Sequence, residues 1–403
     1  MNGGSLHSYR VHFIIIFLLV SFNLRMSFSA ADPLLVFLMR DLGLSVGGSG
    51  LFGLLPIMSL GVAAPLGTRL VNVVRPRLLI VYALLFAIGG VVWRSYGGIA
   101  GLYGGTVAIG LGLGITGSVI LGIVKQVFPG EIPVLMGAYT ACVSLGTAVG
   151  SGAADPVALA LGGWQKGLLF WAMPLLLAVI LWLELMRHKH PPEVQQSTLR
   201  SSIRPLLRQR KAWDVSLFYL FRVAGAWLLI VWLATLMRQR GLPLVEAGMV
   251  LALATACQIP SALLTDALCR KLGGRAQLLY LVVPLSIVGC WGLLEGSLEL
   301  WPLFSICFGL SIGCIFSIGM TLIVVNAADE AATVALSGMA QGLGFIAGGL
   351  LALGASFLMN QPRADLWVAG CYAVFALSGL YFGVRCEKAG VVRVVCSDTG
   401  KRP

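Results

Sequence analysis

Two arginines lie in otherwise apolar stretches of this chain, where a cation is costly. Arg25 stands in FIIIFLLVSFNLRMSFSA and Arg222 in VSLFYLFRVAGAWLLIVWLA, 197 residues apart. An arginine at the middle of a bilayer costs roughly 2.5–3.5 kcal/mol on insertion scales. Its guanidinium keeps its charge and presents paired N–H groups that match carboxylate or phosphate oxygens. We therefore predict that both arginines bind a small anion; for Arg25 the alternative is an ion pair with Asp32, two helical turns further on.

Polar and aromatic side chains in the other apolar stretches are candidates to complete this site. Hydrocarbon offers no partner to hydroxyl, amide or indole groups, so such side chains either bond to a neighbouring helix or line a cavity. Both roles stay open at this point. We predict that the following six bind substrate: Asn23, Ser118, Tyr139, Trp227, Gln258 and Gln341.

Asp32 is the acid closest in sequence to one of these arginines, and it precedes Pro33. A carboxyl group there could carry a coupling proton, and the alternative is a helix-end residue that faces the outer water. Asp155, Glu184 and Asp214 lie at predicted helix ends, where acids are inexpensive, and we assign them no role in transport.

The composition excludes a soluble globular domain. The chain of 403 residues is 58% hydrophobic and 11% charged, against about 25% charged residues in ordinary soluble domains. Stretches long enough to cross about 30 Å of hydrocarbon recur throughout. We predict twelve membrane spans, at 11–35, 48–68, 77–96, 100–124, 133–154, 164–186, 213–236, 244–267, 276–294, 300–325, 332–358 and 366–384.

Lysines and arginines concentrate in alternate connections between these spans. With the N-terminus in the cytoplasm, the inner segments carry 20 of the 28 basic residues and the outer segments carry six, with Arg94 counted among the outer ones. Basic residues favour the cytoplasmic side of a membrane protein. The pattern predicts a multi-pass protein of the bacterial cytoplasmic membrane with both termini inside, and it accounts for the net charge of +12 without a nucleic-acid partner.

Motifs for metal, nucleotide or enzyme chemistry are missing from the sequence. The nine cysteines form no CxxC pair, and all four histidines lie at cytoplasmic ends. A G-x-x-x-x-G-K-[ST] nucleotide loop is also absent. We expect no cofactor, no metal and no enzymatic activity. The N-terminal apolar run resembles a cleavable signal, but its removal would delete one member of the repeat described next, so we expect it to be retained.

Several markers recur at a nearly constant offset, which indicates an internal duplication. The matching pairs are Pro65 with Pro260, Gly110–Gly114 with Gly309–Gly313, Leu135–Gly137 with Leu336–Gly338, and the two arginines themselves. The repeat divides the chain into an N-terminal six-helix bundle (1–186), a basic cytoplasmic linker (187–212), a C-terminal six-helix bundle (213–385) and a cytoplasmic tail (386–403) that we expect to be disordered.

The connection after the eighth span begins with an acid and continues with bases. Asp266 is followed by Arg270 and Arg275, whereas the connection after the second span keeps its bases, Arg69 among them, but lacks the acid. We predict that these four residues form a conformational gate, with charged contacts that hold one arrangement of two moving halves. Together with six helices in each half, this pair of loops resembles the major facilitator superfamily of transporters over essentially the whole chain.

Within that superfamily the chain is similar to the cyanate permease and 2-nitroimidazole transporter group. The resemblance is carried by Asn23–Arg25, Ala31–Leu35, Ile123–Pro129, Met136–Tyr139 and Leu336–Gly342. It implies an all-α integral membrane protein whose twelve helices form two pseudo-symmetric six-helix bundles around a central cavity. The chain departs from the group at Arg222, where members tend to carry asparagine. One arginine in each of the first and seventh helices is instead similar to the superfamily's organophosphate:phosphate antiporters.

The residues and the resemblance together predict a secondary active transporter. The predicted cargo is a small inorganic or organic anion, such as cyanate or a carboxylate, moved by alternating access. The alternative is an exporter of small neutral or aromatic drugs of the nitroimidazole type; a membrane-embedded sensor or lipid-modifying enzyme is a further alternative from a different class. The expected partners are the anionic substrate, a coupling proton and membrane lipids, and the expected state is a monomer.

Overall fold

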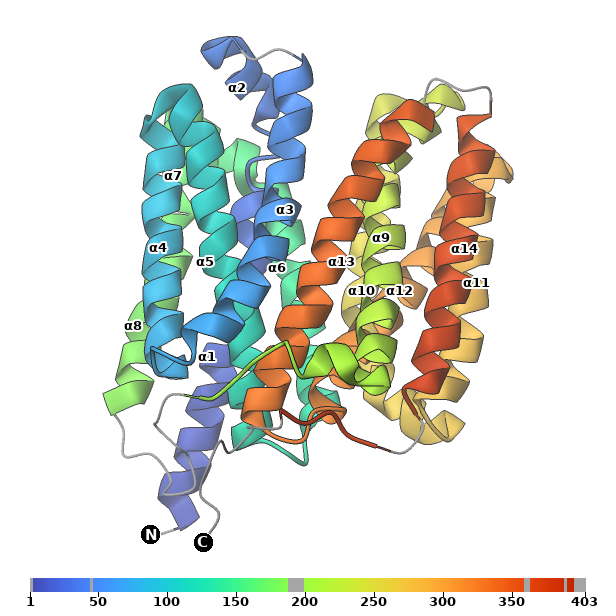
Figure 1. The fold of residues 1–403 in the computed structure, drawn as a ribbon. Coiled ribbons are helices and arrows are strands. Elements are labelled where there is room, and N and C mark those ends of the chain that lie inside the picture. The colour runs from blue at the N-terminus through green and yellow to red at the C-terminus, as the bar shows by residue number, and fades with distance from the viewer. Residues whose placement is uncertain (1–2, 44–45, 188–198, 359–362, 388–389, 395–403) are drawn as a thin grey trace, which may run out of the picture.

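The computed structural model describes residues 3–43, 46–187, 199–358, 363–387 and 390–394. This part of the chain is almost entirely helical (Figure 1). In chain order its helices are α1 (Gly3–Ser29), α2 (Leu35–Leu42), α3 (Val46–Leu70), α4 (Pro76–Tyr96), α5 (Gly98–Val127), α6 (Ile132–Ala160), α7 (Trp164–Phe170), α8 (Ala172–Arg187), η1 (Leu206–Arg208), α9 (Arg210–Gln239), α10 (Leu244–Leu272), α11 (Arg275–Glu295), η2 (Leu298–Leu300), α12 (Trp301–Val325), α13 (Glu330–Leu358) and α14 (Ala364–Arg385).

The twelve predicted spans are confirmed, because 12 helical segments of the described chain are long and apolar enough to cross a membrane. Helices α7 and α8 together supply one of them, at Trp164–Arg187. The first span ends earlier than predicted: α1 stops at Ser29 and the short α2 begins only at Leu35. Pro33 explains the break, because proline has no backbone N–H and disfavours helical geometry in Asp32, the residue before it.

Matching helices of the two halves pack by matching glycines. In the N-terminal half, a Cβ atom at Gly114 of α5 would lie 2.5 Å from the Cβ of Ala63 in α3. In the C-terminal half, a Cβ at Gly313 of α12 would lie 2.6 Å from the carbonyl oxygen of Gln258 in α10. Both pairs follow the offsets of the sequence repeat. The duplication therefore extends from sequence to helix packing.

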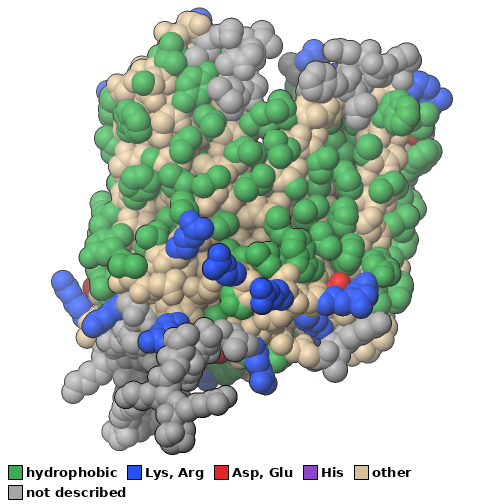
Figure 2. Space-filling model, in the orientation of Figure 1, with side chains coloured by type: hydrophobic (Ala, Val, Ile, Leu, Met, Phe, Trp, Pro, Cys, Tyr) green, Lys and Arg blue, Asp and Glu red, His purple; other side chains and the backbone are tan. Residues whose placement is uncertain are grey.

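The two halves meet closely along α3 and α13. A Cβ at Gly342 would lie 2.7 Å from Cγ of Pro65 and 3.3 Å from the carbonyl oxygen of Gly61. Thr68 Oγ1 donates a hydrogen bond of 3.1 Å to the carbonyl oxygen of Val334 across the same interface. These contacts lie toward the end of the molecule that holds the termini (Figure 1). At the opposite end, Figure 2 shows a hollow between the two lobes.

The linker and part of the tail cross the end that holds the termini. Ser201 exchanges hydrogen bonds with Asn72 at 2.8 and 2.9 Å, and its hydroxyl donates to the carbonyl oxygen of Ala331 in α13 at 2.8 Å. Val392 of the tail is fully buried and forms a parallel β-bridge with Ala327. The expectation of a disordered tail is therefore wrong for residues 390–394, while 395–403 lie outside the described residues.

The surface agrees with a membrane setting. Figure 2 shows hydrophobic side chains over the middle of one face, and most of the Lys and Arg side chains visible on that face lie toward the end with the termini. Large apolar side chains such as Trp93, Trp291 and Trp367 are about half exposed. The chain is a multi-pass membrane protein.

Candidate functional site

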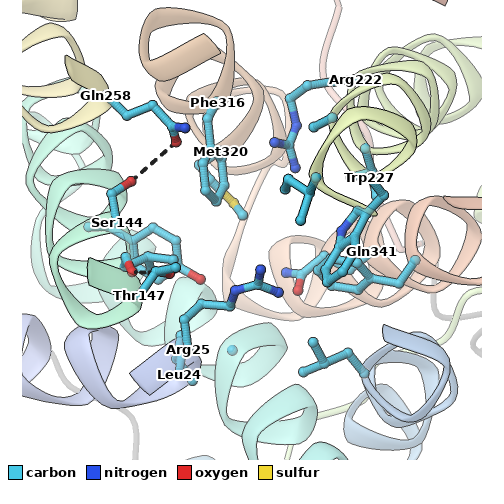
Figure 3. A pocket seen from close by; sticks show the side chains of 18 of the residues that line it. Leu24, Arg25, Ser144, Thr147, Arg222, Trp227, Gln258, Phe316, Met320 and Gln341 are labelled. Atoms are coloured by element: carbon cyan, nitrogen blue, oxygen red, sulfur yellow. Dashed lines mark hydrogen bonds between the residues drawn. The ribbon is translucent and has the colours of Figure 1, made fainter. Parts of the chain in front are cut away.

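The two intramembrane arginines line one cavity between the halves. Arg25 comes from α1 and Arg222 from α9, the first helices of the two bundles. Figure 3 shows their guanidinium groups pointing toward the centre of this cavity from different sides. The cavity has a volume of about 130 Å³. Pockets for drug-sized ligands span about 300–1,000 Å³, so this volume favours a compact solute.

Aromatic rings cover the faces of both guanidinium groups. The Cζ atom of Arg25 lies 4.8 Å from the ring centroid of Trp227, which belongs to the opposite half. The Cζ atom of Arg222 lies 4.3 Å from the centroid of Phe316 and 4.5 Å from that of Tyr219. Cation–π contacts stabilise a charge without using its N–H groups. These ring contacts therefore do not occupy the N–H edges of the two guanidinium groups.

No carboxylate neutralises the arginines inside the cavity. The described lining residues include no Asp or Glu, and neither arginine takes part in an ion pair within the described chain. The expected alternative partner of Arg25, Asp32, is close enough to attract it but forms no ion pair with it. The buried Nε of Arg222 has no hydrogen-bond partner among the described residues. A buried donor of this kind is costly to leave unpaired.

Four other predicted binding residues also line the cavity. Tyr139, Trp227, Gln258 and Gln341 come from α6, α9, α10 and α13. The Gln258 side-chain oxygen accepts a 3.4 Å hydrogen bond from Ser144 Oγ, and Gln341 Nε2 donates to Ser337 Oγ at 2.7 Å. Both amides are thus held by neighbours at the edge of the cavity. The structure brings these four together with the arginines.

The remaining two predicted residues face away from the cavity. Asn23 donates to the carbonyl oxygens of Leu19 and Pro174, so its side chain faces α8. Ser118 donates to the carbonyl oxygen of Ile115 and lies against Gly67 of α3. Neither is among the lining residues.

Several residues that line the cavity were not predicted from the sequence. Tyr219 and Phe316 stack on Arg222, while Ser144 and Thr147 supply hydroxyl groups opposite (Figure 3). Tyr219 was detectable, because it lies three residues before Arg222 and residues at this spacing share a helix face. The hydroxyl residues carry no such signal, since Ser and Thr are common in membrane helices.

Asp32 lies beyond the end of the first span, and the buried Arg94 attracts it in addition to Arg25. Its side chain reaches water, but protein surrounds it on most sides, and this desolvation raises the pKa of its carboxyl to about 6. Attraction by Arg25, and to a lesser degree by Arg94, opposes the rise in pKa. Arg94 lies inside the predicted span 77–96 but was counted with the outer basic residues, and that count is wrong: Arg94 lies within α4 and is only 1% exposed.

The sequence profile of the Major Facilitator Superfamily matches residues 17–352. This match covers most of the chain. The chain belongs to the major facilitator superfamily. It is a transporter of this family rather than an enzyme.

Three relatives share this membership at a moderate distance. The chain is 28% identical over 331 residues to the 2-nitroimidazole transporter of Escherichia coli (strain K12), with 82% of this chain and 83% of that one covered. It is 28% identical over 368 residues to the cyanate transport protein CynX of the same organism, covering 89% and 94%. It is also 26% identical over 347 residues to an uncharacterized transporter, YycB, of Bacillus subtilis (strain 168), covering 86% of each. The predicted resemblance is confirmed.

Solved structures of the superfamily share the fold. A bacterial homologue of the iron transporter ferroportin, in an outward-facing state, superposes with a TM-score of 0.73 at 14% identity, covering 93% of this chain and 99% of that one. The transporter FucP in its outward conformation gives a TM-score of 0.67 at 16% identity, covering 92% and 99%. At such low identity these likenesses concern the fold alone.

The predicted gate residues of this superfamily member lie at the end that holds the termini. Arg270 pairs with Asp266 one turn earlier in α10, and Arg275 pairs with Glu387 at 2.7 Å. The first ion pair lies within the C-terminal half and the second joins that half to the tail, so neither crosses between the two halves. Arg69 is exposed at the end of α3. The described contacts that cross between the halves at this end are instead made by residues such as Thr68, Val334 and Ser201.

Proposed function

We propose that this transporter carries a small anion by alternating access, with Arg25 and Arg222 as its anion-binding pair. The observation that carries the proposal is the pairing of two cations, one from each half, in a cavity whose described lining has no acid. An anion between them would offset both charges and join the halves. Because a ligand favours the conformation that it binds better, such bridging would promote closure around the anion.

The contacts of each arginine support a planar or compact anion. Rings occupy the guanidinium faces, so an anion is expected to bind at the N–H edges, where Arg222 Nε has no partner among the described residues. Gln341 and Gln258 add amide groups nearby. One of the relatives is named as a cyanate transport protein, and cyanate is a compact anion of this kind. We take cyanate as the first probe.

Orientation and coupling belong to the same proposal. The bias of 20 inner against six outer basic residues supports both termini in the cytoplasm. The hollow between the lobes then faces outward, and the α3–α13 contacts close the inner side. Asp32 would carry a coupling proton between the outer water and the site, and the gate residues Arg69, Asp266, Arg270 and Arg275 would act on the inner side. We propose a monomer as the working unit.

Binding of cyanate to the purified protein in nanodiscs tests the anion proposal. We expect Arg25→Gln and Arg222→Gln each to weaken binding by about 10-fold to 100-fold, the loss expected for a charge-assisted hydrogen bond. Arg238→Gln is the matched control, because Arg238 is an exposed residue of the same helix as Arg222 and lies outside the described cavity lining. Equal cyanate binding by all four proteins would overturn the proposal.

A second candidate cargo is a small neutral aromatic molecule. Trp227, Tyr139, Tyr219, Phe316 and Phe345 all line the cavity, and one relative is named as a 2-nitroimidazole transporter. Trp227→Leu separates the two cargoes. An aromatic cargo loses its stacking surface in this variant, whereas an anion keeps both guanidinium groups. Strong 2-nitroimidazole binding that survives Arg222→Gln but not Trp227→Leu would favour this candidate.

A further inference from the structure

Arg94 is a buried cation with unfilled donors. It is 1% exposed and ranks among the largest fully buried side chains of the described chain. Its Nη2 donates a 2.9 Å hydrogen bond to the carbonyl oxygen of Ser27, whereas its Nε and Nη1 have no partner among the described residues. A buried charge is costly unless it is compensated. Something near Arg94 must therefore favour the charge.

The C-terminal end of α1 supplies one compensation. The last carbonyl groups of a helix have no partner within the helix. In α1, the carbonyl oxygens of Met26 and Phe28 accept hydrogen bonds from the N–H groups of Ala30 and Ala31, whereas the carbonyl oxygen of Ser27 accepts from Arg94. A cation at a helix C-terminus also interacts favourably with the helix dipole. Arg94 thus holds the last turn of the helix that carries Arg25.

Asp32 supplies the second compensation. It follows α1 directly, and it is the acid whose attraction acts on Arg94. Asp32 also attracts Arg25, so one carboxylate lies in the fields of two arginines. Both α1 and α4 belong to the N-terminal half, so this arrangement moves with that half as a unit. The field of Arg94 at Asp32 therefore stays constant while the field of a bound anion comes and goes.

We propose that Arg94 is a positioning residue for the anion site: it fixes the end of α1 behind Arg25 and stabilises the ionised form of Asp32. The proposal deepens the proposed function and rests on it for its effect on transport. Its structural part concerns α1 and Asp32 alone. A replacement of Arg94 should therefore change the Asp32 titration and the dynamics of the α1 end even without any substrate.

Infrared titration of the full chain in nanodiscs tests the electrostatic part. The band of the protonated Asp32 carboxyl is assigned by its loss in Asp32→Asn. Arg94→Gln removes a cation that attracts the Asp32 carboxylate, so the pH at which this band reaches half of its full intensity should rise by about half a pH unit to one pH unit. Arg94→Lys keeps the charge and should leave the midpoint within about 0.3 unit of wild type. An unchanged midpoint in Arg94→Gln, or a shift in Arg94→Lys as large as in Arg94→Gln, would overturn this part.

Hydrogen exchange of residues 24–31 tests the positioning part. Exchange should become about tenfold faster in Arg94→Gln, as expected for loss of a charged hydrogen bond, and less so in Arg94→Lys. Arg240→Gln is the matched control, because Arg240 donates to the carbonyl oxygens of Leu293 and Gly296 at the end of α11, away from the cavity. It should speed exchange at 293–296 and leave 24–31 unchanged. Equal exchange at 24–31 in Arg94→Gln and wild type would overturn this part.

Cyanate binding links the two parts to the anion site. At a pH well above the Asp32 midpoint, where Asp32 is ionised in both proteins, Arg94→Gln should weaken binding by about threefold to tenfold because the end of α1 behind Arg25 is less well held, with Arg94→Lys closer to wild type. If wild type itself binds no cyanate, the proposed function fails while the infrared and exchange measurements still decide the role of Arg94. If Arg94→Gln does not fold, Arg94→Lys carries the test, because it keeps the charge but changes the hydrogen-bond geometry. An Asp32 titration midpoint near that of wild type, together with faster hydrogen exchange at 24–31, supports the proposal. Hydrogen exchange at 24–31 equal to that of wild type overturns it.

Discussion

The two ends of the interface between the halves are built differently. At the end that holds the termini, α3 and α13 approach through small residues, and a Cβ at Gly338 would lie 3.0 Å from the carbonyl oxygen of Ala64. At the other end the lobes part and the surface is hollow (Figure 2). Backbones that touch leave no room for sliding, whereas an open end with charged groups can respond to water, protons and anions. The observed conformation is thus held at one end.

The closed end is also reinforced by chain segments that belong to neither bundle. Ser201 of the linker bonds to Asn72 of the N-terminal half and to Ala331 of the C-terminal half. Gln209 exchanges hydrogen bonds with the backbone of Arg393, whose neighbour Val392 is bonded to Asn326 and Ala328. Of these bonds, those of Ser201 join the two halves, so opening this end requires breaking them on one side or the other. The comparison therefore predicts that changes at the closed end shift the population of conformations, whereas changes at the open end alter how the site responds to charge.

The largest effect is expected from Gly338→Leu. A side chain there would meet Thr68 and the backbone of Ala64, and overpacking of this kind typically costs about 1–3 kcal/mol. That cost applies only while the end with the termini is closed, so the ratio of molecules open at this end to molecules closed there should rise by about 5-fold to 150-fold. Spin labels at the exposed positions Arg69 and Lys271 in a cysteine-free background would report this as longer distances.

Gly354→Leu in the same helix is the control for this measurement. A Cβ at Gly354 meets no atom within 4 Å, so its distances should match those of the parent protein. If Gly338→Leu folds and keeps the parent distance distribution, the glycine contact does not hold this end closed.

A smaller shift is expected from Asn72→Ala. This change removes the two hydrogen bonds, of 2.8 and 2.9 Å, that tie Asn72 to the backbone of Ser201. A typical net value of about 1 kcal/mol for each bond predicts a shift of about 5-fold to 30-fold toward opening of the closed end. The same pair of spin labels measures it. Ser202→Ala is the control, because the Ser202 hydroxyl accepts a hydrogen bond from the N–H of Arg204 within the linker itself. Equal shifts in both variants would show that the Asn72–Ser201 bonds do not hold this end closed.

The span architecture was readable from sequence because it depends on simple lengths and repeats. A stretch of about 20 apolar residues indicates a span whatever its neighbours are. The glycine and proline markers of the repeat survive because close helix packing restricts them to few residue types. The same holds for the arginine pair: a cation within a span needs a polar surrounding, so Arg25 and Arg222 were expected to face a cavity.

It was harder to predict which individual side chains point into the cavity and which point toward a neighbouring helix. Asn23 and Arg25 are two residues apart, which places them about 200° apart around a helix, so they cannot both face the cavity. Hydropathy also cannot tell whether a charged residue near the end of a span faces water or is buried in the bundle, and for this reason Arg94 was counted with the outer basic residues. The ordered tail residues were missed because Val392 gains its burial from the distant 326–328 segment. Such contacts leave no local pattern.

The smallest effect is expected at the open end, in the pH dependence of anion binding. The pKa of Asp32 is raised to about 6 by desolvation, and its charged neighbours are Arg25 and Arg94. Above this pH the ionised carboxyl competes with an anion for Arg25, and below it the protonated carboxyl does not. A screened interaction worth about 1 kcal/mol predicts that the Kd of a permanently ionised probe such as nitrate is about fivefold lower at pH 5 than at pH 7.5. Asp32→Asn should bind nitrate at both pH values with the affinity that wild type shows at the lower pH. If the same pH dependence persists in Asp32→Asn, another group is responsible for it, and Asp32 is not the proton sensor of the open end.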